Sequence, residues 1–130
     1  MSTNKPAQET KSTGYFKASQ YGKELFNITI VVAQNHQGTL LLEGIDFTHQ
    51  NACSVWINPS TPSGEQAFVP DTGTRVILIT PTGDHSAFSG TFNAQLDNLN
   101  EKYKMRFKLN FHGNNPDIEG ELDITGLNPT

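Results

Sequence analysis

Histidines close to acidic residues are the side chains of this sequence whose types could carry out chemistry. His49 follows Asp46 by three positions, and His85 directly follows Asp84. Such pairs can ligate a metal ion or transfer a proton. Neither pair has the spacing of a zinc or calcium motif, and a single cysteine, Cys53, rules out paired thiolate ligands. We therefore expect no metal site and no cofactor, and we assign these side chains to loops where they can hydrogen-bond a ligand.

The one tryptophan of the chain marks a second candidate site. In the segment 53–58 (CSVWIN), strand alternation points Val55 and Ile57 inward and turns Trp56 outward together with Asn58. An outward indole can stack on a sugar ring or anchor a subunit interface, whereas an offset alternation or a covering loop would bury it. The candidate ligand-binding residues are Trp56, Asn58, Asp46, His49, Asn51, Asp84 and His85.

Four basic residues alternate along one segment near the C-terminus: Lys102, Lys104, Arg106 and Lys108. They resemble a row that binds anions, but a segment with several acidic residues follows at 117–125. The whole chain carries nine Lys plus Arg, thirteen Asp plus Glu and a net charge of −4, so it has no global field that attracts nucleic acid. We interpret the basic row as one half of cross-strand ion pairs on a solvated face, and we expect no nucleic-acid partner.

Glu43 stands in an apolar stretch and could take two positions. If the inward face runs through Leu41 and Ile45, its carboxylate is the floor of a pocket. A bulge at Leu41 would instead turn Glu43 outward and place Leu40 and Leu42 inside. We expect the bulge, because three consecutive leucines break the alternation of this segment.

The composition limits the class of protein to which these candidate residues can belong. The chain has 130 residues, of which 35% are hydrophobic and 17% charged, and its apolar runs are far too short to span a membrane. No apolar segment near the start has the features of a signal peptide. With one cysteine and no such segment, cytoplasmic residence is the default expectation, and non-classical export is also compatible with the sequence.

Period-two alternation, interrupted by Gly, Pro and Asn, predicts an all-β fold of antiparallel strands. We expect about nine strands, forming either a β-sandwich or a closed β-barrel, at residues 14–19, 24–34, 39–47, 53–58, 66–69, 75–80, 87–96, 103–112 and 117–125. Residues 1–13 have no periodicity and are expected to be a flexible N-terminal arm, followed by a single β domain over 14–130.

The last three predicted strands form a meander whose register can be derived. A loop at residues 98–101 places Phe92 opposite Phe107 and Asn93 opposite Arg106. A loop at 112–117 places Lys108 opposite Glu121, and by the same register Arg106 opposite Asp123. Both hairpins then have one apolar and one polar face, and a slip of one residue would reverse every side chain.

Two short segments are similar to pieces of avidin-like chains: Gly14-Tyr15-Phe16 with the hairpin after it, and residues 85–90 (HSAFSG). The tryptophans that line the ligand pockets of such barrels are missing at the corresponding places. The resemblance therefore implies neither biotin binding nor any site residue, and it identifies no family.

These observations favour a non-catalytic binding module, similar to a lectin, that holds a polar small ligand, above all a carbohydrate. The rival hypothesis is a structural or assembly protein that acts through self-association as a homo-oligomer, or through protein docking, with Trp56 as the anchor. No nucleophile elbow, phosphate-binding loop or dinucleotide fingerprint occurs, so we expect no catalytic residue. A small β-barrel enzyme or a carrier of hydrophobic ligands is the third alternative.

Overall fold

The computed structural model describes residues 11–129, which form ten strands and no helix. The strands are β1 (Thr13–Gln20), β2 (Lys23–Ile28), β3 (Val31–His36), β4 (Thr39–Asp46), β5 (Asn51–Ile57), β6 (Gly64–Ala67), β7 (Thr74–Thr80), β8 (Gly83–Asp97), β9 (Lys102–Phe111) and β10 (Asn115–Thr125). No helix among these residues could span a membrane.

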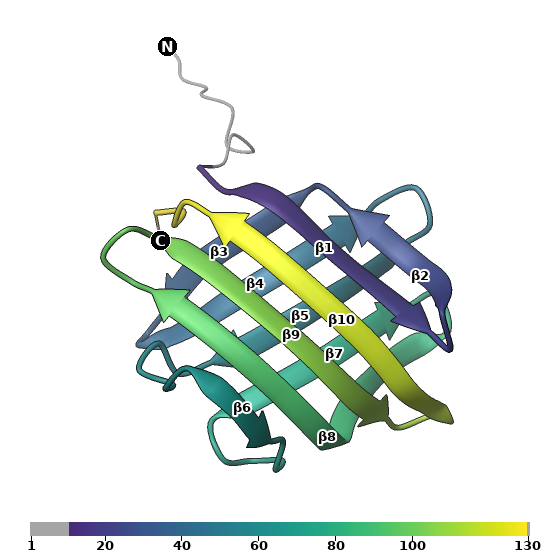
Figure 1. The fold of residues 1–130 in the computed structure, drawn as a ribbon. Coiled ribbons are helices and arrows are strands. Elements are labelled where there is room, and N and C mark those ends of the chain that lie inside the picture. Colours follow the sequence, from purple (N-terminus) through teal and green to yellow (C-terminus); the bar gives the residue numbers. More distant parts are fainter. Residues whose placement is uncertain (1–10, 130) are drawn as a thin grey trace.

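The strands make one antiparallel sheet that is nearly closed into a barrel, as the sequence predicts. Their order is β2-β1-β10-β9-β8-β7-β5-β4-β3, and β6 pairs with β8. The sheet is folded into two layers whose strands cross (Figure 1). The first layer holds β2, β1, β10, β9 and β6, the second layer holds β3, β4, β5 and β7, and β8 belongs to both. The expected C-terminal meander is present as β8, β9 and β10.

β8 makes one corner of the barrel. Its first residues pair with β7, between Ser86 and Gly83, and the rest pair with β9, with a register shift between Ala87 and Ser89. Gly90 follows the shift with a φ of 128°. A Cβ atom at this position would lie 2.2 Å from the carbonyl oxygen of Lys108. Only glycine therefore lets β8 approach β9 this closely at the corner.

The chain makes a second corner between β2 and β3, where the sequence predicted a single strand over residues 24–34. That prediction was wrong, because the alternation of buried and exposed side chains shifts by one residue at the corner. Phe26 and Ile28 are buried in the first layer, whereas Val31 and Ala33 are buried in the second. Ile30 lies between them and is 53% exposed.

The bulge expected at Leu41 was also wrong. β4 pairs with β3 and with β5 without any register shift. Leu41 lies on the outer face opposite Trp56 and is nevertheless buried, with 8% of its surface exposed. Regular alternation alone places Leu40 and Leu42 inside, so Glu43 points outward as expected but for a different reason.

Large apolar side chains from both layers fill the interior. The ring of Phe16 meets Phe26 and Phe107 edge to face, at centroid distances of 6.0 and 6.3 Å. Leu42 and Val55 of the second layer are completely buried in the same cluster. Burial of this apolar surface is the main stabilising contribution that the sequence offers.

The N-terminal boundary lies slightly earlier than Gly14, where the sequence placed it. β1 begins at Thr13, and Ser12 is buried. The Ser12 hydroxyl donates to the Gly126 carbonyl and accepts the Ala33 amide, at 2.7 and 2.9 Å. This segment thus links β3 to the end of β10, while residues 1–10 of the expected arm lie outside the described part of the chain.

Replacing Gly90 by alanine tests the corner in β8. We expect the free energy of unfolding to fall by more than the roughly 1–3 kcal/mol that a strained backbone conformation alone costs, because the new Cβ also strikes the Lys108 carbonyl. Urea unfolding measures the loss. Gly73→Ala is the matched control, since Gly73 has a φ of 108° but a Cβ there meets nothing within 4 Å. Equal losses in the two variants would show that the close approach at Gly90 is unimportant.

The Cys53 thiol should be inert in the folded protein. Burial raises the pKa of this thiol, and the thiolate is the reactive form. A coloured disulfide reagent is expected to label no cysteine in native buffer and one cysteine per chain in denaturant. Rapid labelling in native buffer would contradict the packing of β5 into the core.

Candidate functional site

The outer face of the first layer carries a continuous row of polar side chains. Strand pairing sets Glu65 beside Asn93, Asn93 beside Arg106, Arg106 beside Glu121, and Glu121 beside Lys17. All five side chains lie on one face, because residues directly opposite each other in antiparallel strands point the same way. We call these five residues the central row.

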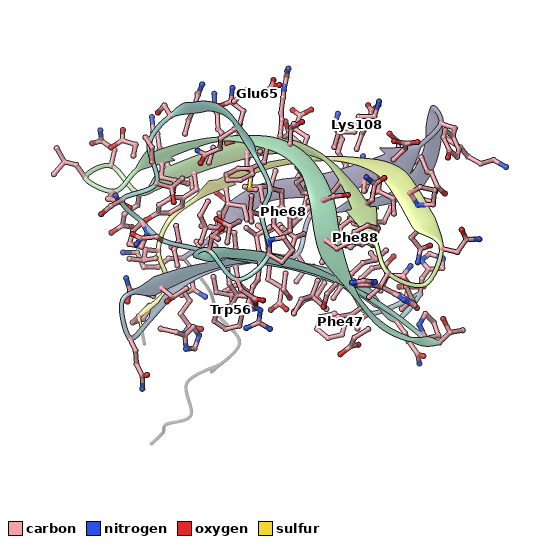
Figure 2. The ribbon with its side chains drawn as sticks, turned by 90° about the horizontal axis from the view of Figure 1, so that it is seen from below. Phe47, Trp56, Glu65, Phe68, Phe88 and Lys108 are labelled. Carbon is pink, nitrogen blue, oxygen red and sulfur yellow. The ribbon has the colours of Figure 1, made fainter. Side chains whose placement is uncertain are left out.

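The central row forms the floor of a groove of about 610 Å³. β6 with Glu65 bounds the groove on one side, and the β1–β2 hairpin bounds it on the other with Ser19, Gly22 and Glu24. Lys108 and Glu119 also line it. Figure 2 shows Glu65 and Lys108 on this side of the molecule, opposite Trp56 and Phe47. We call this depression the charged groove.

The strand register under the groove agrees with the register predicted from the sequence in the β8–β9 hairpin and differs from it in the β9–β10 hairpin. Phe92 lies opposite Phe107 and Asn93 opposite Arg106, as predicted for β8 and β9. The prediction for β9 and β10 was wrong by two residues, because Lys108 lies opposite Glu119 and not opposite Glu121.

The two-residue difference has a local cause. The turn is shorter than the expected loop at 112–117, because Phe111 already pairs with Asn115. A register shift follows between Asn115 and Ile118, and Asp117 has a φ of 52°. A shift of two residues keeps each side chain on its face, so the apolar and polar faces are as predicted.

The basic side chains of β9 do not form the ion pairs that we expected. Within residues 11–129, the two ion pairs are Lys11 with Glu101 at 3.7 Å and His49 with Asp46 at 2.8 Å. The neighbouring carboxylate of Glu121 instead accepts a hydrogen bond of 2.7 Å from the Tyr15 hydroxyl. This hydrogen bond, more than any other contact, raises the pKa of Tyr15. Arg106 and Lys108 therefore face the charged groove without a carboxylate partner.

The floor of the groove contains a buried acceptor that is not used. The side-chain oxygen Oδ1 of Asn93 is buried and has no hydrogen-bond partner, the one such side-chain atom within residues 11–129. Leaving a buried polar atom unpaired costs about 1–3 kcal/mol. Such an atom calls for an explanation, and it lies between Glu65 and Arg106 on the groove floor.

The residues predicted from sequence as ligand-binding lie outside the charged groove, and strand pairing places Asn51 beside Asp46 but not beside Trp56. Trp56 and Asn58 lie at the C-terminal end of β5, and Asn51 begins that strand. A rise of about 3.4 Å per residue puts Asn51 roughly 17 Å from Trp56. The structure therefore does not bring these three side chains together.

The other predicted residues belong to two neighbouring hairpins. Asp46 and His49 share the β4–β5 turn, where His49 Nδ1 lies 2.8 Å from Asp46 Oδ2, and this contact lowers the pKa of Asp46. Asp84 and His85 lie in β8 and not in a loop, with Asp84 opposite Ile79. In the described part of the chain, no three His, Cys, Asp or Glu side chains could share a metal ion.

The basic row of β9 could be predicted from the sequence, but the groove could not. The alternating charges of β9 and β10 were visible in the sequence, and Asn93 was placed correctly beside Arg106. The walls come from β6 and from the β1–β2 hairpin, which are distant from β9 in the sequence. Asn93 opposite Arg106 in the predicted register was the sequence signal that could have pointed to this groove.

Asparagine variants test whether Asn93 contributes to stability. Because the unpaired Asn93 Oδ1 costs the folded state free energy, Asn93→Ala should not lower the free energy of unfolding and should raise it, by at most about 1–3 kcal/mol. Asn110 is the control, since its Nδ2 donates to Ser89 Oγ and its Oδ1 accepts the Asp117 amide, both at 2.9 Å. Asn110→Ala should cost roughly 1–3 kcal/mol. Urea unfolding compares them, and a larger loss at Asn93 would mean that its side chain is satisfied within the fold.

Comparisons with known proteins give no functional information about this chain. No family model, no curated protein and no solved structure matches it. The function therefore has to be inferred from the side chains of the two outer faces.

Proposed function

We propose that this protein is a non-catalytic binding module that holds a hydroxyl-rich small ligand, a carbohydrate, in the charged groove. The observation that carries the proposal is the buried, unpaired Oδ1 of Asn93 on the groove floor. A sugar hydroxyl can donate to this oxygen and remove the cost of leaving it unpaired. The proposal keeps the ligand class that the sequence favours but locates it on the face opposite Trp56.

The charges of the groove favour a neutral ligand. The lining includes three basic side chains and four carboxylates, which nearly cancel: Lys17, Arg106, Lys108, Glu24, Glu65, Glu119 and Glu121. A polyanion or a polycation would meet as much repulsion as attraction there. A hydroxyl group both donates and accepts, so it can bind guanidinium and carboxylate groups that alternate across the strands.

The position of the polar groups also supports a preformed site. Asn93, Arg106 and Glu121 lie on the paired strands β8, β9 and β10, not on loops. Neighbouring strands are about 4.8 Å apart, a spacing that one sugar ring can span. Side chains on paired strands lose little freedom when a ligand binds, which favours affinity.

Titration of the ¹⁵N-labelled full chain with a panel of neutral methyl glycosides tests the proposal by NMR. We expect shifts at the backbone amides of Asn93, Arg106 and Glu121 with at least one sugar. The sugar should be recovered unchanged, which distinguishes binding from hydrolysis.

Two variants and one control sharpen this test. Arg106→Leu should weaken binding about tenfold or more, since a hydrogen bond to a charged group contributes about 1.5–3 kcal/mol. Asn93→Ala should weaken it about two- to tenfold, since a hydrogen bond between neutral groups contributes about 0.5–1.5 kcal/mol. Lys104→Gln should bind normally, because Lys104 lies on β9 but does not line the groove. An absence of shifts with every sugar, or shifts confined to the surroundings of Trp56, would contradict a site in the charged groove.

A further inference from the structure

The outer face of the second layer carries a patch of apolar side chains among polar ones. Its outward positions on β3, β4, β5 and β7 include seven apolar residues, Val32, Leu41, Ile45, Ala52, Trp56, Ile77 and Ile79, and six polar ones, Gln34, His36, Thr39, Glu43, Ser54 and Arg75. At its margin Phe47 is 69% exposed, and Ile30, whose carbonyl accepts the Ile45 amide, is 53% exposed. Trp56 and Phe47 lie on the same side of the molecule in Figure 2. We call this surface the apolar face.

Such a face is unusual for a sheet in contact with water. A sheet with one solvated face normally carries polar side chains there, as the first layer of this protein does. A contiguous apolar patch marks an interaction surface. Most of the apolar face lies on β4, β5 and β7, which have paired strands on both sides, so its partner must pack against side chains and does not add a strand there.

Residues 1–10 are not suited to cover this face. They include Met1, Pro6 and Ala7 as their less polar members, and the others are polar or charged. They contain no aromatic or branched aliphatic side chain that could pack against Ile77 or Trp56. These ten residues therefore do not supply a cover for the apolar face.

We propose that a second copy of this chain covers the apolar face and forms a symmetric dimer with the two second layers face to face. The charged side chains on this face are the reason for choosing a second copy as the partner. Glu43 on β4 lies opposite Ser54, and Arg75 on β7 lies opposite Trp56, so the two charges flank β5 on either side. The Glu43 carboxylate accepts a hydrogen bond from the Ser54 hydroxyl, and within residues 11–129 neither Glu43 nor Arg75 is part of an ion pair.

Consider a two-fold axis that lies between the two apolar faces and runs parallel to β5. This axis places β4 of each copy over β7 of the other copy. Glu43 of one copy then lies over β7 of the other copy, one row of residues from Arg75. Along a strand this offset is about 7 Å, which an arginine side chain can span. The two-fold symmetry forms the contact between Glu43 and Arg75 twice. All four charges of the interface are then neutralised in apolar surroundings.

The size of the face fits a reversible dimer. Four strands at about 4.8 Å and seven residues at about 3.4 Å give a flat area of roughly 19 by 24 Å. The protruding side chains of the face, together with Phe47 and Ile30 at its margin, enlarge this area. The total is near the low end of the area buried in specific interfaces, about 600 Å² per partner. The charged grooves stay open on the two far sides of the dimer, so this inference does not rest on the proposed function.

Sedimentation velocity of the full chain over a dilution series tests the proposal. We expect a dimer at high protein concentration that dissociates on dilution, with the emission of the single tryptophan shifting to longer wavelength as Trp56 becomes exposed. Ile77→Glu places a charge at the centre of the apolar face and should leave a monomer throughout. Gln95→Glu adds the same charge on the opposite face and should leave the dimer intact.

Further variants keep the test decisive if Ile77→Glu fails to fold. Phe47→Ser alters a turn side chain that is 69% exposed and should weaken the dimer at least tenfold without affecting folding. Glu43→Arg and Arg75→Glu should each weaken it similarly, and the two together should restore it. A wild-type monomer at every concentration, a dimer unaffected by Phe47→Ser, or a double variant no better than the single ones would overturn the proposal.

Discussion

The structure depends on one strand, β8, that is shared by both layers. Its first residues hydrogen-bond to β7, and its remaining residues hydrogen-bond to β9 and β6. The bulge after Ala87 and the positive φ of Gly90 allow the change of direction. Because the sheet folds back at this corner, its inner faces bury the core and its two outer faces point in opposite directions.

The two outer faces have opposite chemistry, and this difference is the basis of both proposals. On the first layer, Arg106 and Lys108 lie beside carboxylates without forming ion pairs, and the amide oxygen of Asn93 is buried without a partner. Arg106 and Lys108 can exchange water for the hydroxyls of a ligand. On the second layer, Val32, Leu41 and Ile45 lie around Glu43, Leu41 also lies beside Trp56, and such apolar side chains gain free energy by leaving water.

Much of this fold could be predicted because alternation and turn residues are local signals. The β8–β9 register followed from the loop at 98–101 alone. The corner at Ile30 could not be predicted, because both halves of the segment 24–34 alternate and a phase change of one residue leaves each half regular. The β9–β10 register failed for a related reason, since a bulge before Ile118 changes the count without changing the faces. The charged groove was harder still, because its walls are brought to β9 by strand pairings that are remote in the sequence.

Carbohydrate binding in the charged groove requires a sugar hydroxyl to donate to the side-chain oxygen of Asn93. The ¹³C resonance of the Asn93 side-chain carbonyl, followed by NMR while a sugar saturates the protein, reports this hydrogen bond, because a new donor deshields this carbon. We expect a downfield shift at Asn93 and none at Asn110, whose oxygen already accepts the Asp117 amide. A resonance of Asn93 that stays in place while the sugar binds would contradict the proposed hydrogen bond.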